Sequence, residues 1–149
     1  LKCKYGGRRE YLDHYGQMMV RYGVTYISRW RPQALVPIPL HKSQMRRRGF
    51  NQSACLAHAM GRAFGIPVRE HMLEKEKKTR QQKELDVDAR RQNIKGAFSM
   101  GRDLAPLQRI LLVDDVYTTG STVDEAARCL KKAGCGAVYV LTLCIGKGF

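Results

Sequence analysis

The feature that most constrains the fold is a run of four aliphatic residues, Ile110–Val113, with polar sequence on both sides. Such a run predicts a strand that is buried on both faces of a sheet. An amphipathic helical pattern follows between Val123 and Ala133 and stops at Gly134, and a second apolar run covers Ala137–Ile145. Strand, helix and strand within about 35 residues predict a right-handed crossover, so we expect an α/β fold with a central, mostly parallel sheet flanked by helices.

Polar residues fill the connection between this strand and this helix. Ligands of open parallel sheets bind beyond the carboxyl ends of the strands, and helix N-termini attract anions, so the connection is a candidate phosphate site. Acids paired beside a phosphate site indicate a sugar diol or a metal ion. Thr122 and Glu125 also have the spacing of a capping box at the helix start. In order, the polar residues are the two carboxylates Asp114 and Asp115 and then Thr118, Thr119, Gly120, Ser121 and Thr122.

Two other interpretations of this segment are weaker. Two acids at a helix start are also typical of a solvated turn, but the five hydroxyl-bearing or glycine residues that follow favour a phosphate site. A P-loop would require lysine where Ser121 stands, and no GxGxxG motif follows a predicted strand.

We expect a single domain over residues 1–149, with a helical lead-in over residues 1–33 and a flexible, polar segment over residues 74–95. Prolines end a short strand over residues 34–39, and a loop is expected at residues 41–50. The next helix is capped by Asn51 or Ser53 and ends at Gly65 and Pro67. Its predicted inner face consists of Leu56, Met60, Ala63 and Phe64.

Aromatic and apolar side chains recur at helical spacing between Glu10 and Tyr22 and predict one amphipathic helix with a buried stripe. We interpret the tyrosines of this stripe as part of the core or of a dimer face rather than as a platform for stacked bases. The stripe consists of Tyr11, Tyr15, Met18, Met19 and Tyr22.

The chain is strongly basic, with 27 Lys and Arg residues against 13 Asp and Glu residues, and its charge is unevenly distributed. One basic cluster lies at residues 42–48 and a second at residues 75–95, whereas the C-terminal third is nearly balanced. Three explanations stay open: a polyphosphate ligand, nucleic acid, or a surface charge that only keeps the protein in solution. The local clustering favours an anionic partner.

Five cysteines occur without a CxxC pair, so neither a disulfide framework nor a zinc knuckle is indicated. Together with the absence of a leader-like segment, this predicts a cytoplasmic protein in a reducing compartment. No apolar run approaches the roughly 20 residues of a membrane span.

The strand, the acid pair and the Thr-Thr-Gly-Ser-Thr turn resemble the phosphoribosyl pyrophosphate (PRPP) motif of type I phosphoribosyltransferases. Within that superfamily the chain resembles the ComF competence-protein family. Three further blocks carry this resemblance: Val36-Pro37-Ile38-Pro39-Leu40-His41, then Arg48-Gly49-Phe50-Asn51-Gln52-Ser53, and finally Thr79, Gln82, Leu85, Arg90 and Asn93 before Gly96-Ala97-Phe98.

The resemblance implies a role for each block. Asp114 and Asp115 would act as the catalytic pair that holds the ribose 2′ and 3′ hydroxyls with Mg²⁺ nearby, and Thr118–Thr122 would bind the 5′-phosphate. Residues 74–95 would form a flexible lid over PRPP, carrying Thr79, Gln82, Arg90 and Asn93. The pyrophosphate would be bound by Pro39, Leu40 and His41 and neutralised by Lys42, Arg46 and Arg48.

Two functions therefore follow from the sequence. The first is an enzyme that transfers a phosphoribosyl group from PRPP to a nitrogen acceptor and releases pyrophosphate. The second is a non-catalytic module that binds PRPP or a nucleoside monophosphate and engages single-stranded DNA, or competence and replication-restart proteins, during DNA uptake. Thr118 stands where purine-salvage relatives carry aspartate, so a purine acceptor is not favoured. Family members usually begin with a cysteine-rich zinc-binding segment, and none occurs in this sequence.

Overall fold

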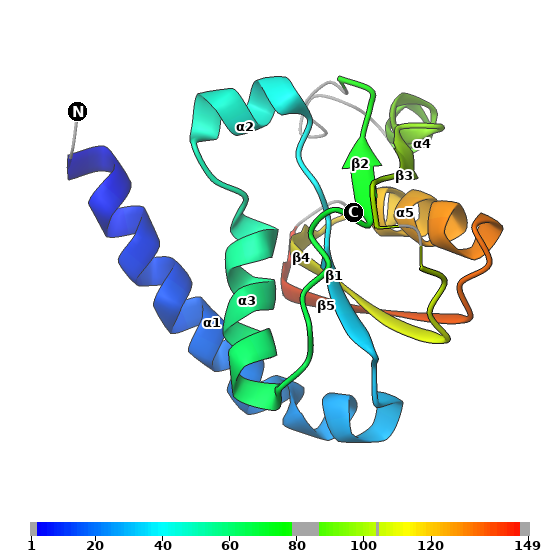
Figure 1. The fold of residues 1–149 in the computed structure, drawn as a ribbon. Coiled ribbons are helices and arrows are strands. Elements are labelled where there is room, and N and C mark those ends of the chain that lie inside the picture. The colour runs from blue at the N-terminus through cyan, green and yellow to red at the C-terminus, as the bar shows by residue number, and fades with distance from the viewer. Residues whose placement is uncertain (1–2, 79–86, 104, 147–149) are drawn as a thin grey trace.

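The computed structural model describes residues 3–78, 87–103 and 105–146, and side chains from residue 10 onward apart from that of residue 87 (Figure 1). Five helices and five strands are assigned within these ranges. In chain order they are α1 (Cys3–Trp30), β1 (Ala34–Pro37), α2 (Lys42–Arg48), α3 (Gln52–Phe64), β2 (Leu73–Lys75), α4 (Val87–Ile94), β3 (Phe98–Met100), β4 (Arg109–Tyr117), α5 (Ser121–Lys132) and β5 (Ala137–Ile145).

The central sheet has the order β1-β4-β5, and both pairings are parallel. Figure 1 shows α1 and α3 on one side of this sheet and α5 on the other. Successive side chains of β4 therefore enter different cores: Leu111 and Val113 pack with α1 and α3, whereas Ile110 and Leu112 pack with α5. All four side chains are fully buried, which confirms the predicted central strand and the crossover through α5.

A second, two-stranded sheet contains part of the segment over residues 74–95 that was expected to be flexible, so this prediction covered too many residues. Glu74 and Lys75 belong to β2, which pairs antiparallel with β3, and residues 87–94 form α4. Buried Leu73, Ile94 and Phe98 anchor these elements on the α5 side of the molecule. Arg90 and Asn93 therefore lie on a helix, whereas Thr79 and Gln82 fall outside the described residues.

Three local expectations were wrong, two because side chains made other hydrogen bonds and one because strand pairing extends further than expected. Residues 42–48 form α2 instead of a loop, since the His41 side chain accepts a hydrogen bond from Ser43 N and caps the helix. The predicted capping box at α5 is absent: Gly120 is the N-cap, and Glu125 accepts a hydrogen bond from Gly96 N instead. Strand β4 also continues past the acids to Tyr117, because β5 pairs with it along this whole length.

Helix α1 turns a different face to the protein than its aromatic pattern predicted. Tyr11 and Tyr22 are 65% and 67% exposed, so of the two interpretations of the tyrosines, core or dimer face, the core was wrong. The packed face contains Gly16, Met19 and Gly23, and a Cβ added to Gly16 would lie 2.8 Å from Ala59 Cβ of α3. Close contact between two helices, made possible by small residues, outweighs the burial of the larger aromatic side chains.

One further observation concerns membranes: in the part of the chain that the structure describes, no helix combines the length and the apolar character needed to cross one.

The two glycines of this face give opposite predictions for the same substitution. Glycine to alanine inside a helix usually stabilises by about 1 kcal/mol. Gly23→Ala should show this gain, because its Cβ would meet only the flexible ends of Leu141 and Met60, at 3.4 and 3.6 Å. Gly16→Ala should instead destabilise the protein by about 1–2 kcal/mol, because Ala59 must move.

Urea unfolding of both variants measures the difference. Ala59→Gly in the Gly16→Ala background is the matched control and should recover part of the lost stability. Equal stabilisation by the two alanines would contradict the close packing of α1 on α3.

Candidate functional site

The two acids lie in the C-terminal part of the central strand β4 and differ in exposure. Asp114 is buried, and Asp115 is half-buried. The Oδ1 atom of Asp114 accepts a hydrogen bond from Ser53 Oγ at 3.0 Å and another from Asp115 N at 2.9 Å. Asp114 is therefore held in one position by donors from two distant parts of the chain, α3 and β4.

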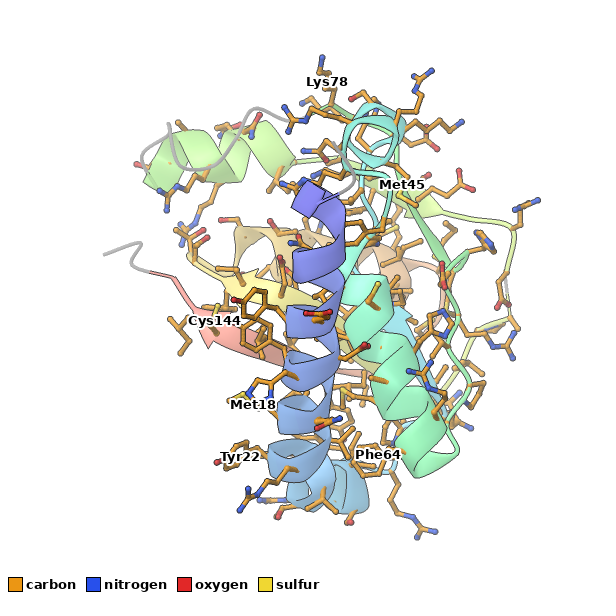
Figure 2. The ribbon with its side chains drawn as sticks, turned by 90° about the vertical axis from the view of Figure 1, so that its left-hand side faces the viewer. Met18, Tyr22, Met45, Phe64, Lys78 and Cys144 are labelled. Carbon is orange, nitrogen blue, oxygen red and sulfur yellow. The ribbon has the colours of Figure 1, made fainter. Side chains whose placement is uncertain are left out.

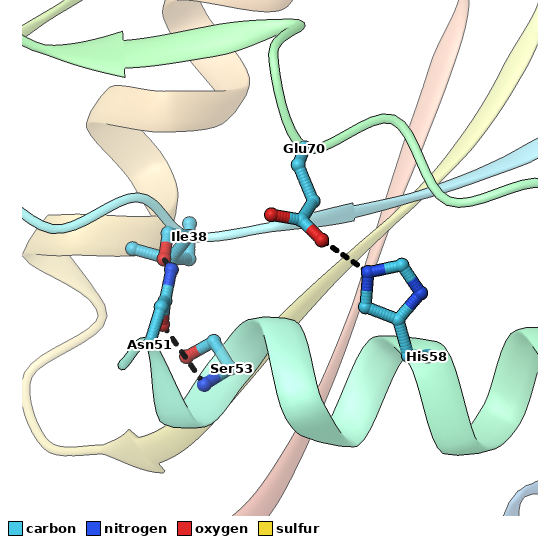
Figure 3. Close-up of polar contacts among 5 residues, drawn as sticks. All are labelled: Ile38, Asn51, Ser53, His58 and Glu70. Atoms are coloured by element: carbon cyan, nitrogen blue, oxygen red, sulfur yellow. Dashed lines mark hydrogen bonds and ion pairs between the residues drawn. The ribbon is translucent and has the colours of Figure 1, made fainter. Parts of the chain in front are cut away.

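The first turn of α3 fixes both this carboxylate and the end of the neighbouring strand β1. Asn51 caps α3 by accepting a hydrogen bond from Ser53 N on its Oδ1, and its Nδ2 donates to Ile38 O at 3.0 Å. Figure 3 shows Ile38, Asn51 and Ser53 in this arrangement. It also shows a second polar link, in which His58 of α3 pairs with Glu70. One helix start thus aligns the segment after β1 with the acid pair on β4.

The environment of Asp114 raises its pKa from the usual 3.8 to about 7. Burial is the main cause, because it disfavours the charged form, and the negative charge of the adjacent Asp115 adds to it. The hydrogen bonds from Ser53 Oγ and Asp115 N act in the opposite direction but do not offset burial. The site therefore favours a proton or a cation next to the acid pair at neutral pH.

The predicted phosphate turn follows Tyr117 and leads directly into α5. Gly120 adopts a φ of +80°, which glycine tolerates, and a Cβ at this position would clash with Tyr117 Oη. The hydroxyl groups of Thr119 and Ser121 lie 2.8 Å apart. Because the N-cap is Gly120, it has no side chain to cap α5, and Thr119 Oγ1 instead accepts a hydrogen bond from Ser121 N at 3.5 Å. A helix start lined by hydroxyl groups is a suitable place for an anion.

The predicted pyrophosphate loop leaves the sheet beside the acids. Strands β1 and β4 are parallel neighbours with Pro37 in register with Val113, so Pro39 and Leu40 emerge at the same sheet edge as Asp114. His41 is partly committed to capping α2 through its Nδ1. The basic residues of α2 differ in position: Lys42 and Arg46 are exposed, whereas Arg48 is half-buried and donates to Gln52 Oε1 at 3.3 Å.

The structure adds Lys75 to this site, a residue that sequence analysis counted only as part of a basic cluster. Lys75 ends β2, and its Nζ lies 5.9 Å from the centre of the Phe98 ring. Burial lowers the pKa of its ammonium group, the negative charge of Asp114 raises it, and Arg48 lowers it further. The second sheet thus places a partly desolvated cation within electrostatic range of both Asp114 and Arg48. Ser53, likewise, was predicted only as a helix cap.

The donor set at Asp114 and Asp115 suits Mg²⁺ better than zinc. Among the described residues, no three His, Cys, Asp or Glu side chains are grouped so that they could hold a metal ion. Proteins bind Mg²⁺ through one or two carboxylates, with water and ligand phosphates completing the shell. As a donor set, the two carboxylates therefore fit Mg²⁺.

The fold is that of the phosphoribosyltransferases. A purine phosphoribosyltransferase from Pyrococcus horikoshii matches 88% of the chain with a TM-score of 0.53 at 14% identity, over 72% of its own chain. A structure described as the allosteric regulatory enzyme of purine biosynthesis matches 89% with a TM-score of 0.58 at 20% identity, over 25% of its own chain. At these identities the likeness defines the fold alone.

Sequence relatives then give the family. Competence protein F of Haemophilus influenzae is 39% identical over 111 residues, which is 73% of this chain and 48% of the relative. DNA utilization protein YhgH of Escherichia coli K12 is 36% identical over 115 residues, and competence protein ComFC of Bacillus subtilis 37% identical over 100 residues. These matches cover 76% and 67% of this chain and 49% and 39% of the two relatives. The chain belongs to this ComF family, as its motifs predicted.

The chain spans about half the length of these two relatives from Haemophilus influenzae and Escherichia coli. No family model matches the sequence.

The pKa of Asp114 makes a prediction about stability. A carboxyl group whose pKa is raised by folding binds more protons in the folded than in the unfolded state, so its contribution to stability falls as the pH rises from about 4 to about 7. Asp114→Asn removes this pH-dependent loss of stability because asparagine does not ionise. Its side-chain oxygen can still accept a hydrogen bond from Ser53 Oγ. The variant should be more stable than the wild type by on the order of 2 kcal/mol at pH 8 and nearly equal to it at pH 4.5.

Chemical unfolding across this pH range provides the measurement. Asp124→Asn, which removes an exposed acid from α5, is the matched control for the change in net charge. Parallel profiles for the wild type and Asp114→Asn would show that Asp114 titrates normally in the folded protein.

Proposed function

We propose that the chain binds PRPP at Asp114–Thr122 and transfers its phosphoribosyl group to a nitrogen acceptor, releasing pyrophosphate. One observation carries the proposal: the acid pair on β4, of which Asp114 is buried, is followed directly by the hydroxyl-rich turn that starts α5. Carboxylates suit the two ribose hydroxyls, and the start of a helix suits the 5′-phosphate. A nucleoside monophosphate presents the same two groups and is the other ligand expected at this position.

In the proposed reaction, the lone pair of the acceptor nitrogen forms a bond to C1 of the ribose as the bond from C1 to the pyrophosphate oxygen breaks. Pyrophosphate leaves with that electron pair, and the nitrogen loses a proton to solvent. Bound Mg²⁺ would supply positive charge to the pyrophosphate and is assigned to Asp114 and Asp115. Lys75 and Arg48 add cationic charge on the side of the second sheet and α2. The chain would act mainly by orienting the ribose and stabilising the leaving group.

Calorimetric titration of PRPP with Mg²⁺ tests the binding step. The wild type should bind, and the double variant Asp114→Asn, Asp115→Asn should bind at least about tenfold more weakly, because both carboxylates lose their charge. Asp124→Asn changes an exposed acid of α5 and should bind like the wild type.

Absence of wild-type binding, or equal binding by the double variant, would contradict the proposed site. If binding is found, pyrophosphate release in the presence of a panel of nitrogen acceptors tests the transfer step. If PRPP binds but no acceptor causes pyrophosphate release, the protein is a ligand-binding module and not an enzyme.

Single-stranded DNA is a second candidate ligand, favoured by the net charge of +14 and by basic side chains on both α2 and α4. Relatives carry the names competence protein and DNA utilization protein, which agree with such a role. Binding through these cations should weaken steeply with salt, because neutralised phosphates release counterions. Replacing Arg46 and Arg47 by glutamine should reduce the slope of log K against log salt by about 1–2. No DNA binding even at low ionic strength would exclude this function.

A further inference from the structure

Exposed apolar side chains are concentrated on one helix, α1. Most large hydrophobic side chains that are exposed in the described part of the chain belong to it, and such a concentration marks an interaction surface more often than scattered residues do. On α1 they are Tyr11, Tyr15, Met18, Tyr22, Val24 and Tyr26, and elsewhere they are Met45, Val116 and Ile145.

Four of these side chains form a row along one face of α1, which we call the tyrosine row: Tyr11, Tyr15, Met18 and Tyr22. Their separations of four, three and four residues keep them on one face, and they extend over about 16 Å of helix. The packed glycine face of α1 lies to one side of the row, and the row keeps 65% and 67% of Tyr11 and Tyr22 and 38% of Tyr15 and of Met18 exposed. Figure 2 shows Met18 and Tyr22 on the side of α1 where Cys144 of β5 also lies.

Strand β5 is the neighbour of this row and ends the central sheet. No strand among the described residues pairs with its outer edge. Trp30 of α1 stacks on Tyr139 of β5 at a centroid distance of 4.8 Å, and Ile145 is 71% exposed. Helix and strand therefore present an apolar surface beside an open sheet edge, a combination that proteins usually cover.

We propose that a second copy of this chain covers the tyrosine row, with the two α1 helices packed antiparallel about a two-fold axis. The row is symmetric about its midpoint: reversing one helix sets Tyr11 opposite Tyr22 and Tyr15 opposite Met18. A two-fold interface requires this kind of self-complementary surface. Three tyrosines and a methionine per copy also match the composition of protein interfaces.

Charge at the border of the row supports the same arrangement. Glu10 and Arg21 both lie on the flank of α1 away from the glycine face, and Arg21 already covers the Tyr22 ring at 5.9 Å. In the antiparallel pair, Glu10 of one copy comes within about 3 Å, measured along the helix axis, of the level of Arg21 of the other. Opposite charges thus meet at both ends of the interface, whereas the net +14 of each copy opposes association and is screened by salt.

Sedimentation velocity over a range of protein concentrations tests the proposal. The wild type should dimerise at micromolar concentration, more tightly at high salt. Tyr11→Ser with Tyr22→Ser should weaken the dimer at least about tenfold. Val24→Ser removes an exposed apolar side chain from another face of α1 and should have no effect. Circular dichroism and thermal unfolding verify that each variant is folded.

A charge exchange tests the antiparallel register. Glu10→Arg and Arg21→Glu should each weaken the dimer, and the double variant with both changes should recover the wild-type association, because the opposite charges then meet again. A monomeric wild type up to about 100 µM would overturn the proposal, as would a dimer that is unaffected by the two tyrosine substitutions. Either result would mean that a partner other than this chain, a polypeptide or a nucleic acid, covers the tyrosine row.

Discussion

The arrangement of this protein depends on one hydrogen bond between residues 61 positions apart, from Ser53 Oγ to Asp114 Oδ1. It joins the start of α3 to the acid pair on the central strand. Asn51, two residues earlier, joins the same helix start to Ile38 after β1. These two contacts hold together the sheet edge at which the acids, the phosphate turn and the loop after β1 meet. Backbone geometry positions each segment, and the polar side chains of one helix turn bring them into alignment.

The same contacts set the chemistry of the site. A carboxylate held in a buried position next to another acid is short of compensating charge, and a raised pKa is the result. Lys75, from the second sheet, supplies part of that charge but is itself desolvated. A ligand that brings a hydroxyl pair, phosphates and a divalent cation would satisfy both the acids and the neighbouring cations. The polarity of the site therefore agrees with a phosphorylated sugar and disfavours an apolar ligand.

Local sequence patterns predicted the parts of this structure that local forces determine: the buried strand, the crossover through α5 and the α3 helix capped by Asn51. Contacts between distant residues produced the exceptions. Glu125 bonds to Gly96, 29 residues away, instead of closing a capping box. Gly16 and Gly23 form the packed face of α1 although neither is hydrophobic, so a pattern of apolar residues indicated the wrong face. Lys75 joins the site only because β2 and β3 pair.

The central claim is that Asp114 is a buried carboxylate beside which a phosphorylated ligand and its divalent cation would bind, as proposed above. An NMR titration of its side-chain carboxyl carbon, with and without PRPP and Mg²⁺, tests this claim most directly. The structure predicts a midpoint near pH 7 in the free protein, because burial and Asp115 oppose ionisation, and a clear fall of that midpoint when the ligand is bound. A midpoint near the ordinary value of 3.8 that the ligand leaves unchanged would contradict the account.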